Sequence, residues 1–167
     1  VSSLTHEGAK VTLDALELGA VDYVPKPGST LSVNVLRLKQ DLIAKVHAVA
    51  HCKPQAVKLE FVSNRRPGRR GPSRSDTVVS SAVFIGASTG GPPAIQKVLS
   101  LVNPDISAPI IIAQHMPKAF TAAFATRMNA ICSIRVKEAV DGEELQNSVV
   151  YICPGDHQTR VERNIEG

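Results

Sequence analysis

The stretch from Val78 to Gln96 places the strongest limits on the fold of this chain. Its first part, Val78 to Ile85, is apolar and rich in β-branched residues, which is typical of a buried strand. From Pro92 onward the prolines suit the start of a helix, and apolar residues then recur at helical spacing. The run from Gly86 to Gly91 lies between these parts, where small residues let the backbone turn sharply. The stretch therefore predicts a strand, a tight turn and a helix.

Glycine-rich turns of this kind serve three known chemistries. A dinucleotide-binding turn needs glycine where this chain has Ser88, and a P-loop needs lysine where it has Pro92. The third pattern, G-x-S-x-G, is satisfied by residues 86–90. There the serine projects as a nucleophile beside free helix N-terminal amides that can bind an oxyanion. Ser88 is therefore the candidate nucleophile, and a tight turn without chemistry remains the alternative.

A histidine that ends the next apolar run is the candidate base. Ala108 to Ala113 reads as a strand, and His115 follows it in the run Gln114 to Pro117. Neighbouring parallel strands place their carboxyl ends at the same edge of a sheet, where α/β proteins build their sites. We therefore expect Ser88 and His115 to meet at that edge if the two strands are neighbours.

Further short motifs follow along the chain in a fixed order. They are Phe120-Thr121, Phe124-Ala125, Val136 to Ala139, Asp141 to Glu143 and Tyr151 to Asp156. Together with the turn and the His115 motif, the series resembles the catalytic domain of the CheB-type chemotaxis protein-glutamate methylesterases, from about Val83 to Asp156. The resemblance implies an α/β fold of three layers, with a mostly parallel sheet and helices on both faces, here truncated.

The resemblance also implies a reaction. Ser88 would attack the carbonyl of a glutamate γ-methyl ester, and His115 would take the serine proton and help to expel methanol. Thr89 N–H is the first candidate for the oxyanion hole. Deamidation of receptor glutamines would follow the same route. The implied substrates are methyl-accepting chemoreceptors, the implied location is the cytoplasm, and no cofactor or metal is implied.

One member of the family's catalytic triad is missing from this sequence. The triad aspartate belongs to a later Gly-Met-Gly-x-Asp-Gly-like motif, which does not occur before Gly167. Asp156 belongs to a different family motif and is not a substitute. We therefore expect the chain to be a fragment that is inactive, or nearly so, on its own.

Residues 1–52 read as β-α-β-α and resemble the last third of a phosphoacceptor receiver domain. Apolar residues recur at helical spacing at Val11, Leu13, Leu16 and Leu18, before a short strand at Ala20 to Val24. An amphipathic helix follows at Leu31 to Val49. Ser2 and Lys26 match the hydroxyl residue and the lysine that sense the phosphate in that family. The phosphoacceptor aspartate is not in this chain. A chemotaxis histidine kinase would be the phosphodonor to a full receiver.

Residues 53–77 differ in composition from both flanking segments. They contain prolines, glycines, serines and five arginines but few acids, which favours an interdomain linker. Such a basic cluster can bind nucleic acid or anionic lipid, but no aromatic residues are interleaved for base stacking. We therefore expect no nucleic-acid partner. The predicted organisation is a receiver remnant at 1–52, a linker at 53–77 and the first part of a catalytic domain at 78–167.

Composition bears on location. No apolar run approaches the roughly 20 residues of a membrane span, so we expect no membrane insertion. Cys52, Cys132 and Cys153 are widely spaced, form no metal-binding pattern and suit a reducing cytoplasm.

Two other functions stay open. One is a non-catalytic regulatory module that holds an anion at the helix N-terminus. The other is a generic α/β serine esterase, although such enzymes run Ser…Asp/Glu…His along the chain, and here the histidine follows the serine directly. Replacing Ser88 by alanine distinguishes the binding module from an enzyme. The substitution should abolish the turnover of an enzyme but only weaken anion binding by the module.

Overall fold

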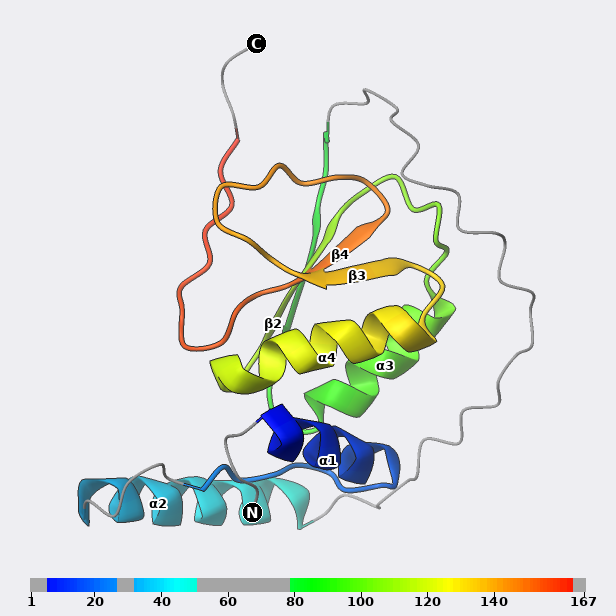
Figure 1. Cartoon of the computed structure of the whole chain (residues 1–167). Coiled ribbons are helices and arrows are strands. Elements are labelled where there is room, and N and C mark those ends of the chain that lie inside the picture. The colour runs from blue at the N-terminus through cyan, green and yellow to red at the C-terminus, as the bar shows by residue number, and fades with distance from the viewer. Residues whose placement is uncertain (1–5, 27–31, 51–78, 164–167) are drawn as a thin grey trace.

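A four-stranded parallel sheet forms the centre of the protein (Figure 1). The computed structural model describes residues 6–26, 32–50 and 79–163. The strands lie in the order β1-β2-β4-β3. Their bounds are Val83–Ala87 (β1), Ile110–Gln114 (β2), Arg135–Glu138 (β3) and Val149–Ile152 (β4). The prediction of a mostly parallel α/β sheet is confirmed.

Within the part of the chain that the structure describes, two helices cover one face of this sheet. Helix α3 (Gly91–Leu101) connects β1 to β2, and α4 (Lys118–Ile131) connects β2 to β3. Alternate residues of the central strands face these helices and form the core, because successive side chains of a strand point to opposite faces. The core includes Ile110, Ile112, Val150 and Ile152 from the sheet, Ile95 and Leu99 from α3, and Phe120, Phe124 and Met128 from α4.

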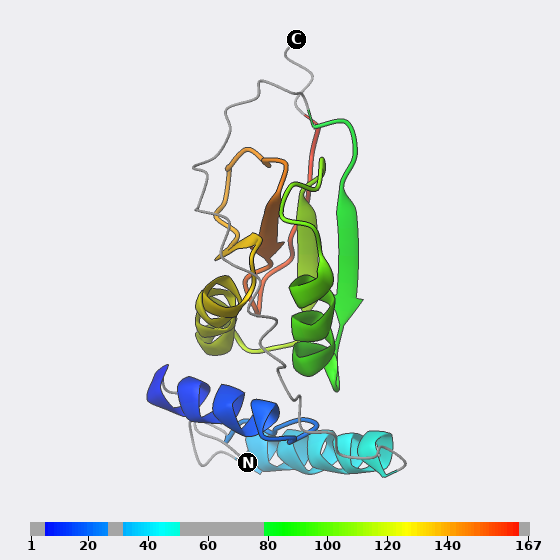
Figure 2. The same cartoon turned by 90° about the vertical axis from the view of Figure 1, so that its right-hand side faces the viewer.

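The opposite face of the sheet has no helix packed on it within the described ranges (Figure 2). Phe84 of β1 points to that side and is 64% exposed. Only one of the two predicted helix layers is therefore seen. No helix in the described ranges has both the length and the apolar character needed to cross a bilayer.

Strand β1 differs from its predicted bounds. It begins at Val83 and continues through Ala87, beyond the expected end at Ile85. The reason is parallel pairing, since Gly86 lies opposite Ala113 and Ala87 opposite Gln114. Ser88 is consequently the first residue after the strand.

Helix α1 (His6–Glu17) packs across α3 and α4, and α2 (Ser32–Val49) lies beyond it (Figures 1 and 2). The buried face of α1 is formed by Ala9, Leu13 and Leu16. The predicted apolar stripe also included Val11 and Leu18, but these are 62% and 83% exposed. The stripe was therefore placed partly on the wrong side of the helix.

The strand predicted at Ala20 to Val24 does not form. Residues 20–24 are irregular, and an isolated bridge follows at Pro25. A strand needs a paired neighbour, and the four-stranded sheet takes all its strands from residues 83–152. The predicted linker at 53–77 and Ser2 both lie outside the described residues.

Candidate active site

Ser88 and His115 meet at the carboxyl edge of the sheet, as the strand order predicts. The Ser88 Oγ atom lies 3.2 Å from Nδ1 of His115, and both residues are exposed. The contact follows from the register, because Ala87 at the end of β1 lies opposite Gln114 at the end of β2. The residue after each strand therefore faces the other.

The turn that carries Ser88 is closed by backbone hydrogen bonds. The N–H of Gly91 donates to the Ser88 carbonyl at 2.8 Å, and α3 begins there. Gly90 has φ of 73°, in the left-handed region that glycine adopts without steric cost. The Thr89 N–H has no acceptor among the described residues. It is thus free to donate to an oxygen beside Ser88.

The segment that carries His115 is held from both sides. The N–H of His115 donates to the Ala87 carbonyl at 2.8 Å, which extends the pairing of β2 with β1 by one residue. The N–H of Lys118, the first residue of α4, donates to Oδ2 of Asp156 at 3.2 Å. Asp156 therefore satisfies a free amide at the start of a helix, where a negative charge is stabilising. This contact gives it a structural role.

The contact through Nδ1 fixes which form of His115 can act as a base. To accept the Ser88 proton, Nδ1 must carry a lone pair, so neutral His115 must hold its proton on Nε2. No hydrogen bond to Nε2 occurs within the described residues. The ring is consequently held from one side only in this part of the chain.

An open groove of about 980 Å³ contains Ser88 and His115. One wall of the groove is the sheet edge with residues 153–158. The other wall is the N-terminal segment (residues 6–26 and 32–50), which contributes Tyr23, Pro25, Asp41 and Lys45. The Tyr23 ring stacks on Phe120 of α4 with centroids 5.0 Å apart. Burial raises the pKa of the Tyr23 phenol, and Asp22, Asp156 and Asp41 raise it further. The N-terminal segment thus borders the site directly.

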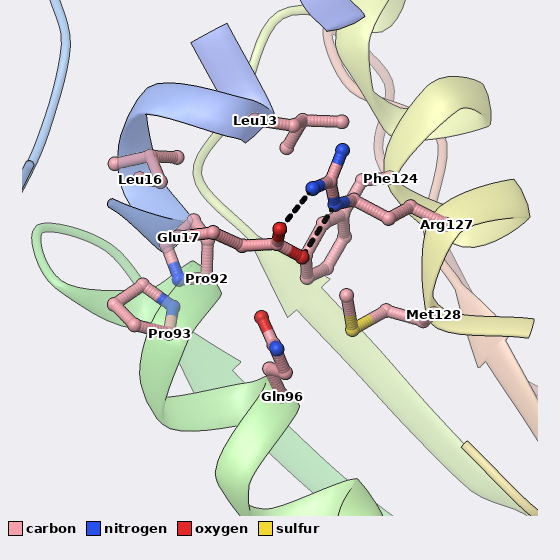
Figure 3. A pocket seen from close by; sticks show the side chains of 9 residues that line it. All are labelled: Leu13, Leu16, Glu17, Pro92, Pro93, Gln96, Phe124, Arg127 and Met128. Atoms are coloured by element: carbon pink, nitrogen blue, oxygen red, sulfur yellow. Dashed lines mark hydrogen bonds and ion pairs between the residues drawn. The ribbon is translucent and has the colours of Figure 1, made fainter. Parts of the chain in front are cut away.

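A second, smaller pocket lies between α1, α3 and α4 (Figure 3). Arg127 of α4 crosses it, donating from Nε to Oε1 of Glu17 at 2.8 Å and from Nη1 to Oδ1 of Asp14 at 2.6 Å. These contacts raise the pKa of the Arg127 guanidinium, chiefly through the hydrogen bond with Glu17. The pocket is also lined by Leu13, Leu16 and Phe124. It is therefore part of the packing of α1 on the sheet domain, which comprises the four strands with α3 and α4 (residues 83–152).

The other predicted site residues have different outcomes. Thr89 lies in the turn after Ser88. Lys26 is exposed and is not among the residues that line the groove. The described residues contain no group of three or more His, Cys, Asp or Glu side chains placed to hold a metal ion.

Sequence reasoning missed Gln114. Its side-chain Nε2 donates to the backbone carbonyls of both Ser88 and His115. The signal was a polar residue at the end of the run Ile110, Ile112, Gln114, whose alternate members face the core. A polar side chain at such a position requires partners, which the sequence alone does not identify.

A serine and a histidine in contact at the carboxyl edge of a parallel sheet form a nucleophile–base pair of the kind that serine hydrolases use. Comparisons with known proteins narrow this class. Residues 83–167 match the family model described as CheB methylesterase. The chain belongs to the CheB methylesterase family.

Relatives of known name support this assignment. The chain is 43% identical over 192 residues to protein-glutamate methylesterase/protein-glutamine glutaminase 2 of Nitratidesulfovibrio vulgaris, covering 99% of this chain and 50% of that protein. It is 45% identical over 172 residues to the protein-glutamate methylesterase/protein-glutamine glutaminase of Lawsonia intracellularis, covering 97% and 48%. The chain therefore spans about half the length of the curated relatives it matches.

A solved structure is similar as well. The Thermotoga maritima CheB methylesterase catalytic domain superposes with a TM-score of 0.50 at 39% identity, over 53% of this chain and 47% of that one. The parallel sheet and its helices therefore have a counterpart of known structure.

Proposed function

We propose that this chain carries the nucleophile and the base of a protein-glutamate methylesterase that also deamidates protein glutamines. The observation that carries the proposal is the 3.2 Å contact between Ser88 Oγ and His115 Nδ1 at the carboxyl edge of β1 and β2. The names of the relatives support the choice of substrate class.

The proposed reaction proceeds in two steps. Ser88 Oγ attacks the carbonyl carbon of a glutamate γ-methyl ester while its proton moves to Nδ1 of His115. The tetrahedral intermediate collapses, and methoxide leaves as methanol with that proton. Water then attacks the acyl-enzyme, gives a proton to His115, and releases the glutamate as Ser88 recovers its own. A glutamine follows the same course with ammonia as the leaving group.

The negative oxygen of the intermediate needs hydrogen-bond donors that are already in place. Thr89 N–H is the first candidate, since it follows Ser88 and has no acceptor within the described residues. In other serine hydrolases the loss of one such donor lowers kcat by about 10²–10³-fold.

His115 also needs an acceptor for Nε2–H, which holds the ring and stabilises the imidazolium form. The aspartate that has this role in the family lies in a motif that this sequence lacks. In a serine protease, changing the corresponding triad aspartate to asparagine lowers kcat by about 10⁴-fold. We therefore expect weak activity at most from this chain alone.

We further propose that the chain is organised as a receiver portion (1–52), a linker (53–77) and a catalytic portion (78–167). The N-terminal segment borders the groove through Tyr23 and Lys45, which supports control of access to Ser88. In this proposal Lys26 and Ser2 sense a phosphate received from a chemotaxis histidine kinase. The substrates are methylated chemoreceptors, and the protein acts in the cytoplasm without nucleic acid or membrane insertion.

The test measures methanol release from methylated chemoreceptor with the chain, its Ser88→Ala variant and its His115→Ala variant. We expect a slow release that both substitutions abolish. Ser81→Ala is the matched control, because Ser81 is exposed and lies just before β1. Release that persists in the Ser88→Ala variant would refute the proposal. Absence of release, together with anion binding that Ser88→Ala only weakens, would favour the binding module.

A further inference from the structure

Gln114, the last residue of β2, connects the two segments that carry Ser88 and His115. We propose that Gln114 is a positioning residue, which holds the nucleophile and the base in contact without touching the substrate. The inference rests on the proposed function, and it is tested below by a measurement that does not depend on activity.

Gln114 is among the residues that line the groove, but its side chain is buried beneath the site. It points to the same face of β2 as Ile110 and Ile112, toward the helices, and is 6% exposed. Its Nε2 donates to the Ser88 carbonyl at 3.0 Å and to the His115 carbonyl at 3.2 Å. One amide group therefore ties together the backbones of the two residues whose side chains meet above it.

The orientation of this amide is determined by its partners. Both are carbonyl oxygens, which only accept, so the NH₂ end must face them. The Oε1 end then lies against Gly91, where an added Cβ atom would be only 1.9 Å away. Oε1 has no hydrogen-bond partner among the described residues. The absence of a side chain at Gly91 thus makes room for the amide.

The remaining backbone contacts make Gln114 the bridge between two fixed parts. The Ser88 carbonyl also accepts from Gly91 N–H at 2.8 Å, which ties it to the start of α3. His115 N–H donates to Ala87 at 2.8 Å, which ties it to β1. A shift of the β2 end relative to the turn would break the Gln114 bonds and separate Ser88 Oγ from Nδ1. Misplacement by about 1 Å lowers rates by about 10²-fold.

Gln96 of α3 is a matched control within the same core. It is 4% exposed, and its Nε2 has no partner among the described residues. It lines the pocket beside Arg127, away from Ser88. Replacing each glutamine by methionine removes a buried amide while keeping the length of the side chain, so a general effect on packing would be shared by both variants.

The kinetic test follows acylation of Ser88 by p-nitrophenyl acetate, which transfers the acetyl group to Oγ and releases p-nitrophenolate. We expect Gln114→Met to lower the rate by about ten- to a hundredfold and Gln96→Met to leave it unchanged. If Gln114 acts through the contact between Ser88 and His115, adding Gln114→Met to His115→Ala should cause little further loss. Equal losses in the presence and absence of His115 would overturn the proposal.

The structural test is the crystal structure of the Gln114→Met chain beside the unchanged one. We expect Ser88 Oγ and Nδ1 of His115 to move beyond hydrogen-bond distance. A preserved contact overturns the positioning role, even if the unchanged chain shows no acylation and the proposed function itself fails. Should Gln114→Met not fold, Gln114→Leu supplies the same test, because it also removes the amide that donates to the carbonyls of Ser88 and His115.

Discussion

Replacing Arg127 by methionine tests how strongly the N-terminal segment is held on the sheet domain. Glu17 accepts from Nε at 2.8 Å and also pairs with Nη2, while Asp14 accepts from Nη1 at 2.6 Å. The Arg127 side chain is 21% exposed, that of Glu17 28% and that of Asp14 48%. The forked contact with Glu17 is therefore the more protected of the two.

The magnitude follows from these exposures. Hydrogen bonds to charged groups contribute about 1.5–3 kcal/mol, whereas fully exposed ion pairs contribute about 0–1 kcal/mol. We expect about 1–2 kcal/mol from Glu17 and less than about 1 kcal/mol from Asp14. Arg127→Met keeps an apolar stem beside Leu13 and Phe124. It should weaken the docking of α1 by about 2 kcal/mol, which lowers the equilibrium constant for docking about 30-fold.

Amide hydrogen exchange measures this change locally. In Arg127→Met the α1 amides should exchange about 30-fold faster, while those of β2 and β4 remain protected. Glu17→Gln should have a larger effect than Asp14→Asn, and 1 M salt should reduce both differences. Unchanged exchange in α1, or equal acceleration in the central strands, would refute the reasoning.

Four further outcomes follow from the structure. Phe124→Ala removes a fully buried ring and should lower the free energy of unfolding by about 3–5 kcal/mol, measured by denaturant titration. Burial raises the pKa of the Cys132 thiol to about 11, so its alkylation, followed by peptide mass spectrometry, should rise about tenfold per pH unit up to that value. The buried Tyr23 hydroxyl has no hydrogen-bond partner among the described residues, so Tyr23→Phe should leave α1 exchange unchanged or slower, whereas Tyr23→Ala should accelerate it. The pKa of the Tyr23 phenol is raised in the folded state, so the stabilisation of α1 docking by its neutral ring should be complete below pH 10 and be lost at higher pH. Tyr23→Phe has no hydroxyl to ionise, so its amide exchange should not show this pH dependence.

The sheet domain was predictable because its local signals agree with its packing. Residues 110–114 and 149–152 are short apolar runs bounded by turns, and both are central strands with neighbours on each side. The pairing of Ser88 with His115 followed from parallel strand order alone, because adjacent parallel strands end at the same edge.

The N-terminal segment was predicted less well, because its packing depends on distant residues. Val11 and Leu18 fit a helical stripe as well as Ala9 does, and only the positions of α3 and α4 decide which side of α1 is buried. The role of Gln114 depends on two backbone carbonyls, and no sequence motif encodes these directly.

The ion pair of Arg127 with Asp14 and Glu17 also affects the order of folding. Asp14 and Glu17 lie 113 and 110 residues from Arg127 in the sequence, whereas the paired residues of β1 and β2 are only 27 residues apart. Closing the longer loop costs more chain entropy, and contacts of high sequence separation form slowly. We therefore expect α1, although it is synthesised before the strands, to dock only after the sheet and α4 have formed.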